Sequence, residues 1–171
     1  PTAPRRFLDV ALCQLRPRYE LAISEYNKLL EHKAKILRSQ EENPSLLYIL
    51  PDFTRRMAKC GAAVIRYRAF FAEKLAAEAA KIHEAVSGCS EQLGIQYQTV
   101  SSVQDPKAPE SQIEQWLLEH SESHAQAELA SAQCLTGPHK DDLQITINGT
   151  AARGFASQGQ TRTAALALKF A

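Results

Sequence analysis

Residues 137–171 read GPHKDDLQITINGTAARGFASQGQTRTAALALKFA and carry the most informative local pattern of the chain. The alternation over 143–147 predicts a strand, and Asn148-Gly149 predicts a two-residue hairpin turn followed by a second strand over 150–153. The next segment, SQGQTR at 157–162, precedes a run of helix-forming residues. We therefore expect a hairpin that leads directly into a loop and a helix.

The loop at 157–162 has the composition of a phosphate-binding site. Ser157 offers a hydroxyl, Gly159 lets a ligand approach the backbone closely, and the positive end of a helix dipole favours an anion. Ser and Gly are also common before any helix, and taken alone the six residues are explained more simply by an ordinary helix cap. The residues around the loop are needed to choose between these interpretations.

The ordered string from Gly137 to Ala171 resembles the RecF family, bacterial recombination and repair ATPases of the ABC and SMC type, in which SQGQ-R is the ABC signature. The opening, PTAPRRFLD at residues 1–9, is also similar to this family, although Pro4 stands where the family usually has the first Arg. The resemblance spans nearly the whole chain and is strongest in its C-terminal third.

In this family the signature of one subunit caps ATP that is held by the other subunit. The resemblance assigns this role to Ser157, Gln158, Gly159, Gln160 and Arg162. It implies ATP and Mg²⁺ as cofactors of the full-length protein, with none bound to this chain alone, and an ATP-dependent homodimer. It also implies a cytoplasmic protein of DNA replication, recombination, repair and the SOS response, which clamps duplex DNA near single-strand gaps and helps load RecA with RecO and RecR.

The chain opens at Pro1 without a Met and closes inside a helical run, and it contains no G-x-x-x-x-G-K-[ST] loop. By resemblance, the Walker A lysine loop lies upstream of this sequence and the acidic Walker B strand lies downstream. We therefore expect an internal fragment that is inactive as an ATPase by itself, cut from a slow ATPase.

Residues 8–36 carry an apolar seam with alternating steps of four and three, which predicts coiled-coil packing. Pro17 falls inside it and predicts that one helix ends near Arg16 and another begins. A second helical pattern over 53–86 and a turn at 41–45 complete an antiparallel helical hairpin. The resemblance favours a lever arm, while the pattern fits two helices of a compact bundle equally well. The seam consists of Leu8, Leu12, Leu15, Tyr19, Ala22, Tyr26, Leu29, Lys33 and Ile36, and only Lys33 interrupts it.

Residues 95–100 alternate and predict a strand, and 110–133 predict a helix with Ile113, Leu117, His120, His124 and Ala127 on one stripe. The predicted fold class is α+β and predominantly helical. It comprises an antiparallel helical lever arm and a partial ABC-type ATPase head with short strands, a β-hairpin and the signature helix. We place the arm at 1–134 and the head at 135–171.

The net charge is only +1, but the charge is uneven along the chain. Residues 1–38 hold eight basic and four acidic side chains, whereas 88–134 hold one and seven. A basic arm can bind a DNA backbone without reading its sequence. A solvated polar face explains each single residue as well. The candidate DNA contacts are Arg5, Arg6, Arg55, Arg56, Arg66 and Arg68.

The remaining polar groups favour structural roles. A carboxylate pair beside His139 could hold a divalent ion, but turn chemistry explains every residue type in Gly137, Pro138, His139, Lys140, Asp141 and Asp142. His120 and His124 lack a third ligand, and Cys13, Cys60, Cys89 and Cys134 lie far apart, so we expect neither a metal site nor a disulfide. No apolar run is long enough to cross a membrane. A fragment of another SMC-type ATPase and a helical interaction module without nucleotide remain as alternatives.

Overall fold

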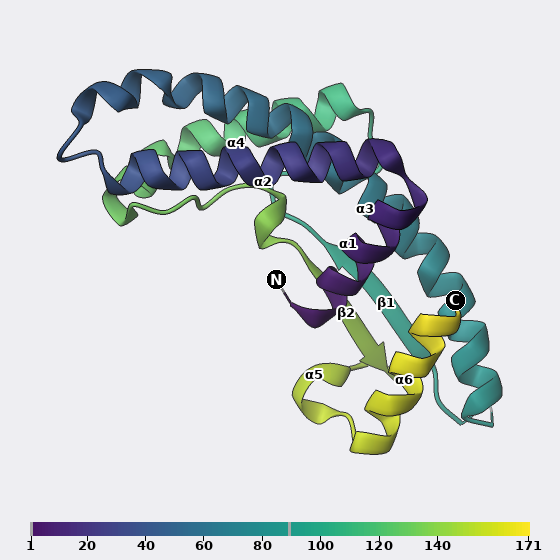
Figure 1. Ribbon diagram of the computed structural model, residues 1–171. Coiled ribbons are helices and arrows are strands. Elements are labelled where there is room, and N and C mark those ends of the chain that lie inside the picture. Colours follow the sequence, from purple (N-terminus) through teal and green to yellow (C-terminus); the bar gives the residue numbers. More distant parts are fainter. Residues whose placement is uncertain (1, 89) are drawn as a thin grey trace. The chain divides into compact units, whose positions relative to one another are not determined.

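The computed structural model describes residues 2–88 and 90–171, so Pro1 of the RecF-like opening and Cys89 lie outside the described residues. The fold is α+β and predominantly helical, as predicted (Figure 1). The helices, strands and short 3₁₀ helices (η) are α1 (Ala3–Leu15), α2 (Pro17–Arg38), η1 (Pro44–Ile49), α3 (Leu50–Val86), β1 (Leu93–Gln98), α4 (Glu110–Ser131), η2 (Pro138–Lys140), β2 (Asp142–Ile147), β3 (Thr150–Ala151), α5 (Ala152–Phe155) and α6 (Gln158–Phe170).

The chain forms two compact units, and each is assembled from separate stretches of sequence. The sheet unit contains residues 2–8, 68–98 and 142–171, and the helical unit contains 9–67 and 99–141. Neither unit ends at the predicted boundary between residues 134 and 135, because β1 shares the sheet unit with β2 and β3. The assignment of an arm and a head to 1–134 and 135–171 stays a prediction.

In the helical unit, α2 and α3 run antiparallel, as the two apolar patterns predicted (Figure 1). The rings of His32 and Phe53 lie 6.0 Å apart, whereas Tyr19, earlier in α2, meets Tyr67, later in α3, at 5.9 Å. The predicted break is confirmed, because α1 ends at Leu15 and Pro17 is the first residue of α2. Proline costs little there, since the first N–H of a helix has no intrahelical partner.

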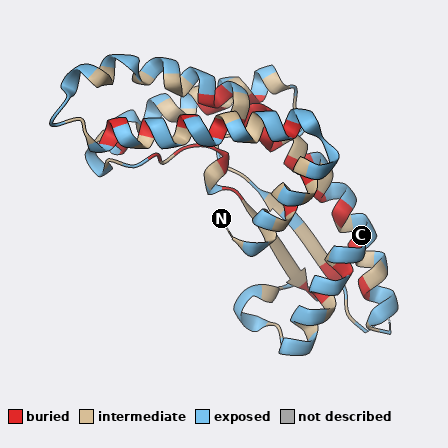
Figure 2. Ribbon diagram, in the orientation of Figure 1, coloured by how far each residue is buried: buried red, intermediate tan, exposed pale blue. Residues whose placement is uncertain are grey.

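The predicted seam is wrong at Leu15, which is 56% exposed because α1 ends at this residue. Figure 2 shows the buried positions that recur along α2, and they include Tyr19, Tyr26, Leu29 and Lys33. The predicted stripe of α4 is correct at Ile113 and Leu117 but wrong at Ala127, which is exposed. Glu128, one position further, is buried instead.

The burial of Lys33 and Glu128 explains the interruption of the α2 seam. Lys33 Nζ lies 2.6 Å from one Glu128 carboxylate oxygen, and the two side chains are 5% and 3% exposed. The other carboxylate oxygen accepts the backbone N–H of Leu135 at 2.7 Å. Together with the Arg18–Glu110 contact at 3.3 Å, this pair sets α4 parallel to α2. The helical unit is therefore a three-helix bundle rather than an isolated hairpin.

In the sheet unit, β1 and β2 pair antiparallel with apolar residues opposite one another, such as Leu93 with Ile147. Asn148 and Gly149 have φ values of 51° and 77° and form the predicted turn between β2 and β3. These two positive φ values suit the twist of a tight hairpin. The second hairpin strand is shorter than the predicted 150–153, because α5 begins at Ala152.

One face of this sheet is covered by helices that present small residues. Ala79 of α3 and Ala164 and Ala167 of α6 pack with Leu93 and Ile147 in a single buried cluster. Alanine side chains allow close approach of a helix to its neighbours, so α6 is held against the sheet and α3 by its second and third turns. Its first turn, which carries the 157–162 segment, is left at the surface.

Two of the cysteines have thiols that stay protonated at neutral pH. Burial raises the pKa of Cys134 to about 11, and burial followed by the charge of Glu25 raises the pKa of Cys60 above its ordinary value. Both therefore behave as small apolar side chains. Among the described residues, no helix has the length and hydropathy that a membrane span requires.

Replacing Lys33 by Met should lower the free energy of unfolding by about 3–5 kcal/mol, because the Glu128 carboxylate would remain buried without its counter-charge. The double variant Lys33→Met/Glu128→Gln should recover part of this loss, since the amide is neutral and its oxygen can still accept the Leu135 N–H. Urea titration of the two variants at pH 7 measures the difference. A double variant less stable than Lys33→Met would contradict the ion pair as the source of the loss.

Candidate functional site

The 157–162 segment forms the N-cap and the first turn of α6, closed by a reciprocal capping box. The Ser157 hydroxyl oxygen accepts the backbone N–H of Gln160 at 3.2 Å, and Gln160 Oε1 accepts the backbone N–H of Ser157 at 2.8 Å. Such a box satisfies two donors that the helix geometry leaves without partners. The ordinary-cap interpretation of the sequence therefore describes the local geometry correctly.

The capping box leaves part of this helix end open to a ligand. The N–H groups of Gln158 and Gly159 are the first two of α6, and a helix provides no carbonyl for them. The Ser157 hydroxyl uses an oxygen lone pair in the box and keeps its hydrogen to donate. Ser157, Gln158 and Gly159 are all exposed. The end of α6 thus offers donors and the positive pole of its dipole to an anion from outside.

Gly159 is not required by the fold. A Cβ built on it would have one neighbour within 4 Å, the Ser157 hydroxyl oxygen at 3.8 Å, which is an ordinary van der Waals distance. An alanine would therefore fit, and it would favour the helix by roughly 0.5–1 kcal/mol. The space that this Cβ would occupy lies beside the Ser157 hydroxyl, so the glycine suits a ligand that approaches both groups.

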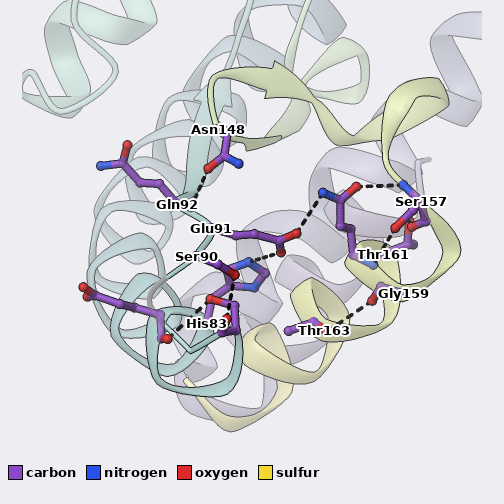
Figure 3. A network of polar contacts seen from close by, with 12 residues as sticks. His83, Ser90, Glu91, Gln92, Asn148, Ser157, Gly159, Thr161 and Thr163 are labelled. Carbon is purple, nitrogen blue, oxygen red and sulfur yellow. Dashed lines mark hydrogen bonds and ion pairs between the residues drawn. The ribbon is translucent and has the colours of Figure 1, made fainter.

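Behind the capping box lies a chain of polar contacts that connects α6 to α3 (Figure 3). Gln160 Nε2 donates to one oxygen of Glu91 at 2.8 Å, and the other Glu91 oxygen lies 3.2 Å from His83 Nε2. His83 is fully buried at the end of α3. The sequence did not predict either residue, because neither is close to 157–162 in the chain and no motif spacing connects them.

The other predicted signature residue, Arg162, is exposed on α6 after the capping box. Two hydroxyls in this first part of the helix donate back to carbonyls four residues earlier. Thr161 Oγ1 donates to the Ser157 carbonyl at 3.0 Å, and Thr163 Oγ1 donates to the Gly159 carbonyl at 3.1 Å. Four of the five predicted signature residues are exposed, and Gln160 is half-buried.

The second candidate cluster, residues 137–142, makes the contacts of a structural element. In the helical unit, His139 Nε2 donates to the Cys134 carbonyl at 3.0 Å, and its Nδ1 shares a hydrogen bond with the Tyr26 hydroxyl at 2.7 Å. Buried Asp141 accepts the Thr99 hydroxyl at 2.8 Å. A carbonyl only accepts, so the Nε2 of His139 carries a proton in this arrangement.

The neighbours of His139 fit this interpretation. Pro138 is buried against Gly61, where a Cβ would lie 3.2 Å from the proline Cδ. Lys140 is exposed, and in the sheet unit Asp142 accepts the Thr2 hydroxyl and the N–H of Leu143. Within residues 2–88 and 90–171, no three His, Cys, Asp or Glu side chains converge as metal ligands.

Most of the candidate DNA-contact arginines already make contacts within the protein. Exposed Arg55 and Arg56 pair with Asp52 at 3.8 Å and with Glu25 at 2.6 Å. The other arginines differ in exposure: Arg5 is half-buried, Arg6 is exposed, and Arg66 is half-buried with its Nε donating to the Ala108 carbonyl at 3.1 Å. The prediction of a DNA contact is wrong for Arg68, because this residue is only 2% exposed and cannot reach a phosphate at the surface.

The chain is similar over its whole length to RecF proteins. It is 33% identical over 171 residues to the DNA replication and repair protein RecF of Acetivibrio thermocellus and 36% identical over 172 residues to that of Bacillus mycoides. Each match covers 100% of this chain and 46% of the relative. No family model matches. The chain thus spans about half the length of the curated relatives it matches.

Solved structures agree with these sequence matches. Two structures of the recombination mediator protein RecF in the RecFOR pathway, with ATP and with ATPrS, match the fold with TM-scores of 0.88 and 0.89 at 30% identity. Both matches cover 99% of this chain, together with 45% of the RecF chain in the ATP structure and 46% of the RecF chain in the ATPrS structure. The similarity therefore includes both compact units, with α6 among their elements.

Replacing Gly137 by Ala should lower the free energy of unfolding by about 2–4 kcal/mol, because its φ is +117° and a Cβ would lie 2.3 Å from the Tyr26 hydroxyl oxygen. Gly149→Ala is the matched control, since its φ is +77° but no atom lies within 4 Å of the added Cβ. Thermal unfolding compares the two. Equal losses would contradict a specific role for the Tyr26 contact.

Proposed function

We propose that this chain, a member of the RecF family, supplies the signature half of a composite ATP site that is completed by a second copy of the full-length protein. The exposed, capped N-terminus of α6 is the observation that carries the proposal. There the Ser157 hydroxyl and the N–H groups of Gln158 and Gly159 are available as hydrogen-bond donors. Donors of this kind at a helix N-terminus suit a terminal phosphate oxygen.

In this proposal, ATP supplies the anionic phosphates and the phosphoryl group that is transferred to water. Ser157 donates its hydroxyl hydrogen to a terminal oxygen, Gly159 admits that oxygen close to the backbone, and the dipole of α6 favours its charge. Arg162 adds an exposed positive charge on the same helix. Because the two halves of the site belong to different copies, nucleotide binding stabilises the dimer and loss of the terminal phosphate weakens it.

The full-length protein is proposed to act in DNA replication, recombination and repair, where the ATP-dependent dimer binds duplex DNA near single-strand gaps and helps load RecA with RecO and RecR. The names of the matched relatives and of the two RecF structures support this assignment. Arg6, Arg55 and Arg56 are the exposed members of the candidate DNA-contact set. Exposed ion pairs such as Arg56–Glu25 contribute little to stability, so an arginine can exchange its partner for a phosphate.

In the full-length protein, Ser157→Arg should abolish ATP-dependent dimerisation, because a bulky cation would fill the position proposed for the phosphate. Gly159→Ala is a smaller probe, which should leave stability unchanged or higher while it weakens dimerisation. Ser131→Arg is the matched control, since this exposed serine ends α4 and a cation is favourable at a helix C-terminus. Sedimentation velocity with and without ATP measures the dimer. An undiminished dimer of Ser157→Arg would refute the composite site.

Replacing Arg55 and Arg56 together by Gln should weaken binding to gapped duplex DNA. If both contact phosphates, the slope of log K against log salt should become shallower by about 0.9 for each lost contact. Lys169→Gln, which removes an exposed charge from α6, is the control and should leave the slope unchanged. Fluorescence anisotropy over a salt series measures the slope, and an unchanged slope in the double variant would remove these two arginines from the DNA surface.

A further inference from the structure

Gln160 uses both ends of its side-chain amide within the protein. Its Oε1 accepts the Ser157 N–H at 2.8 Å, and its Nε2 donates to Glu91 at 2.8 Å (Figure 3). The side chain is half-buried, whereas Ser157, Gln158 and Gly159 are exposed. In this arrangement Gln160 holds the loop in place rather than facing a ligand.

The capping box requires one particular orientation of the Gln160 amide. The oxygen and nitrogen of an amide have nearly the same size, so shape alone does not select between the two orientations. If the amide flipped, its NH₂ would face the Ser157 N–H, which is also a donor, and the box would open. The Ser157 N–H therefore favours the observed orientation, and an acceptor on the other side of the amide, facing its NH₂, would hold that orientation more firmly.

Glu91 is that group, because an ionised carboxylate only accepts hydrogen bonds. It can pair with the NH₂ of Gln160 but not with its oxygen, so it turns the oxygen toward Ser157. Glu91 is in turn held by His83, whose Nε2 lies 3.2 Å from the second carboxylate oxygen. His83 is fully buried on α3 and gives this carboxylate a fixed anchor.

We propose that Glu91, anchored by His83, is the positioning residue of the 157–162 loop. Through the orientation of Gln160 it fixes the N-cap at Ser157, and with it the hydroxyl and N–H groups that face the nucleotide. Gln160 then acts as a positioning residue and does not touch the phosphate. This inference rests on the proposed composite ATP site and adds two residues, His83 and Glu91, which the signature motif does not include.

The polarity of the contact can be reversed within the full-length protein. Gln160→Glu keeps a residue that forms capping boxes but sets two carboxylates against each other, and Glu91→Gln removes the group that orients the amide. The double variant Glu91→Gln/Gln160→Glu restores every donor and acceptor, because Gln at 91 donates to the new carboxylate and accepts from His83. Glu84→Gln is the control for Glu91→Gln, since it also removes one negative charge but at an exposed position on α3.

Sedimentation over an ATP titration gives the concentration at half-maximal dimer, and thermal unfolding reports the fold. Gln160→Glu should raise that concentration roughly tenfold or more, since small displacements of a binding group are costly. The double variant should return close to the wild-type value, and Glu84→Gln should not change it. A purely structural contact would lower the melting temperature without moving the ATP requirement.

The result that overturns this inference is distinct from the result that overturns the composite site. If Ser157→Arg fails to dimerise with ATP but Gln160→Glu has the wild-type ATP requirement, Glu91 is not a positioning residue. The same conclusion follows if the double variant is as impaired as Gln160→Glu while both melt at the wild-type temperature. If Ser157→Arg dimerises normally with ATP, the composite site itself is wrong.

Discussion

The first N–H groups of α6 have no carbonyl partner within the helix. The arrangement of residues 157–162 depends on which groups accept hydrogen bonds from these donors instead. Ser157 and Gln160 satisfy two donors between them and leave the N–H groups of Gln158 and Gly159 exposed. The same helix end is therefore capped and still able to bind an anion. A helix cap and a phosphate site are compatible at this position, because a hydroxyl can accept one hydrogen bond and donate another.

The helical unit is organised by a different constraint, which is the burial of charge. Lys33 and Glu128 are removed from water together, and the carboxylate is completed by the N–H of Leu135. Such a pair is tolerated only when its partners are fixed, so it specifies how α2, α4 and the segment after α4 come together. His139 and Tyr26 hold the adjacent η2 segment through a partly buried hydrogen bond.

Local patterns predicted most elements of the fold, but they could not predict contacts across the chain. Pro17, the Asn148-Gly149 turn and the two helical seams correctly marked the break, the hairpin and the antiparallel helices. The pattern failed at Leu15 and Ala127, because the end of a helix and the position of its neighbours decide which residues are covered. In the candidate site, a helix cap at Ser157 was recognisable, whereas the capping role of Gln160 and its contact with Glu91 and His83 were not predicted.

The sequence by itself determined the family resemblance, the hairpin turn and the helix start at Ser157, since all of these depend on residues adjacent in the chain. Only the tertiary structure decided that Arg68 is buried, that Lys33 has a partner in α4 and that Gln160 meets Glu91. The physical reason is that burial and pairing depend on which surfaces meet after folding. Gln160 and Glu91 are 69 residues apart in the chain, and only the folded sheet unit brings them within hydrogen-bond distance.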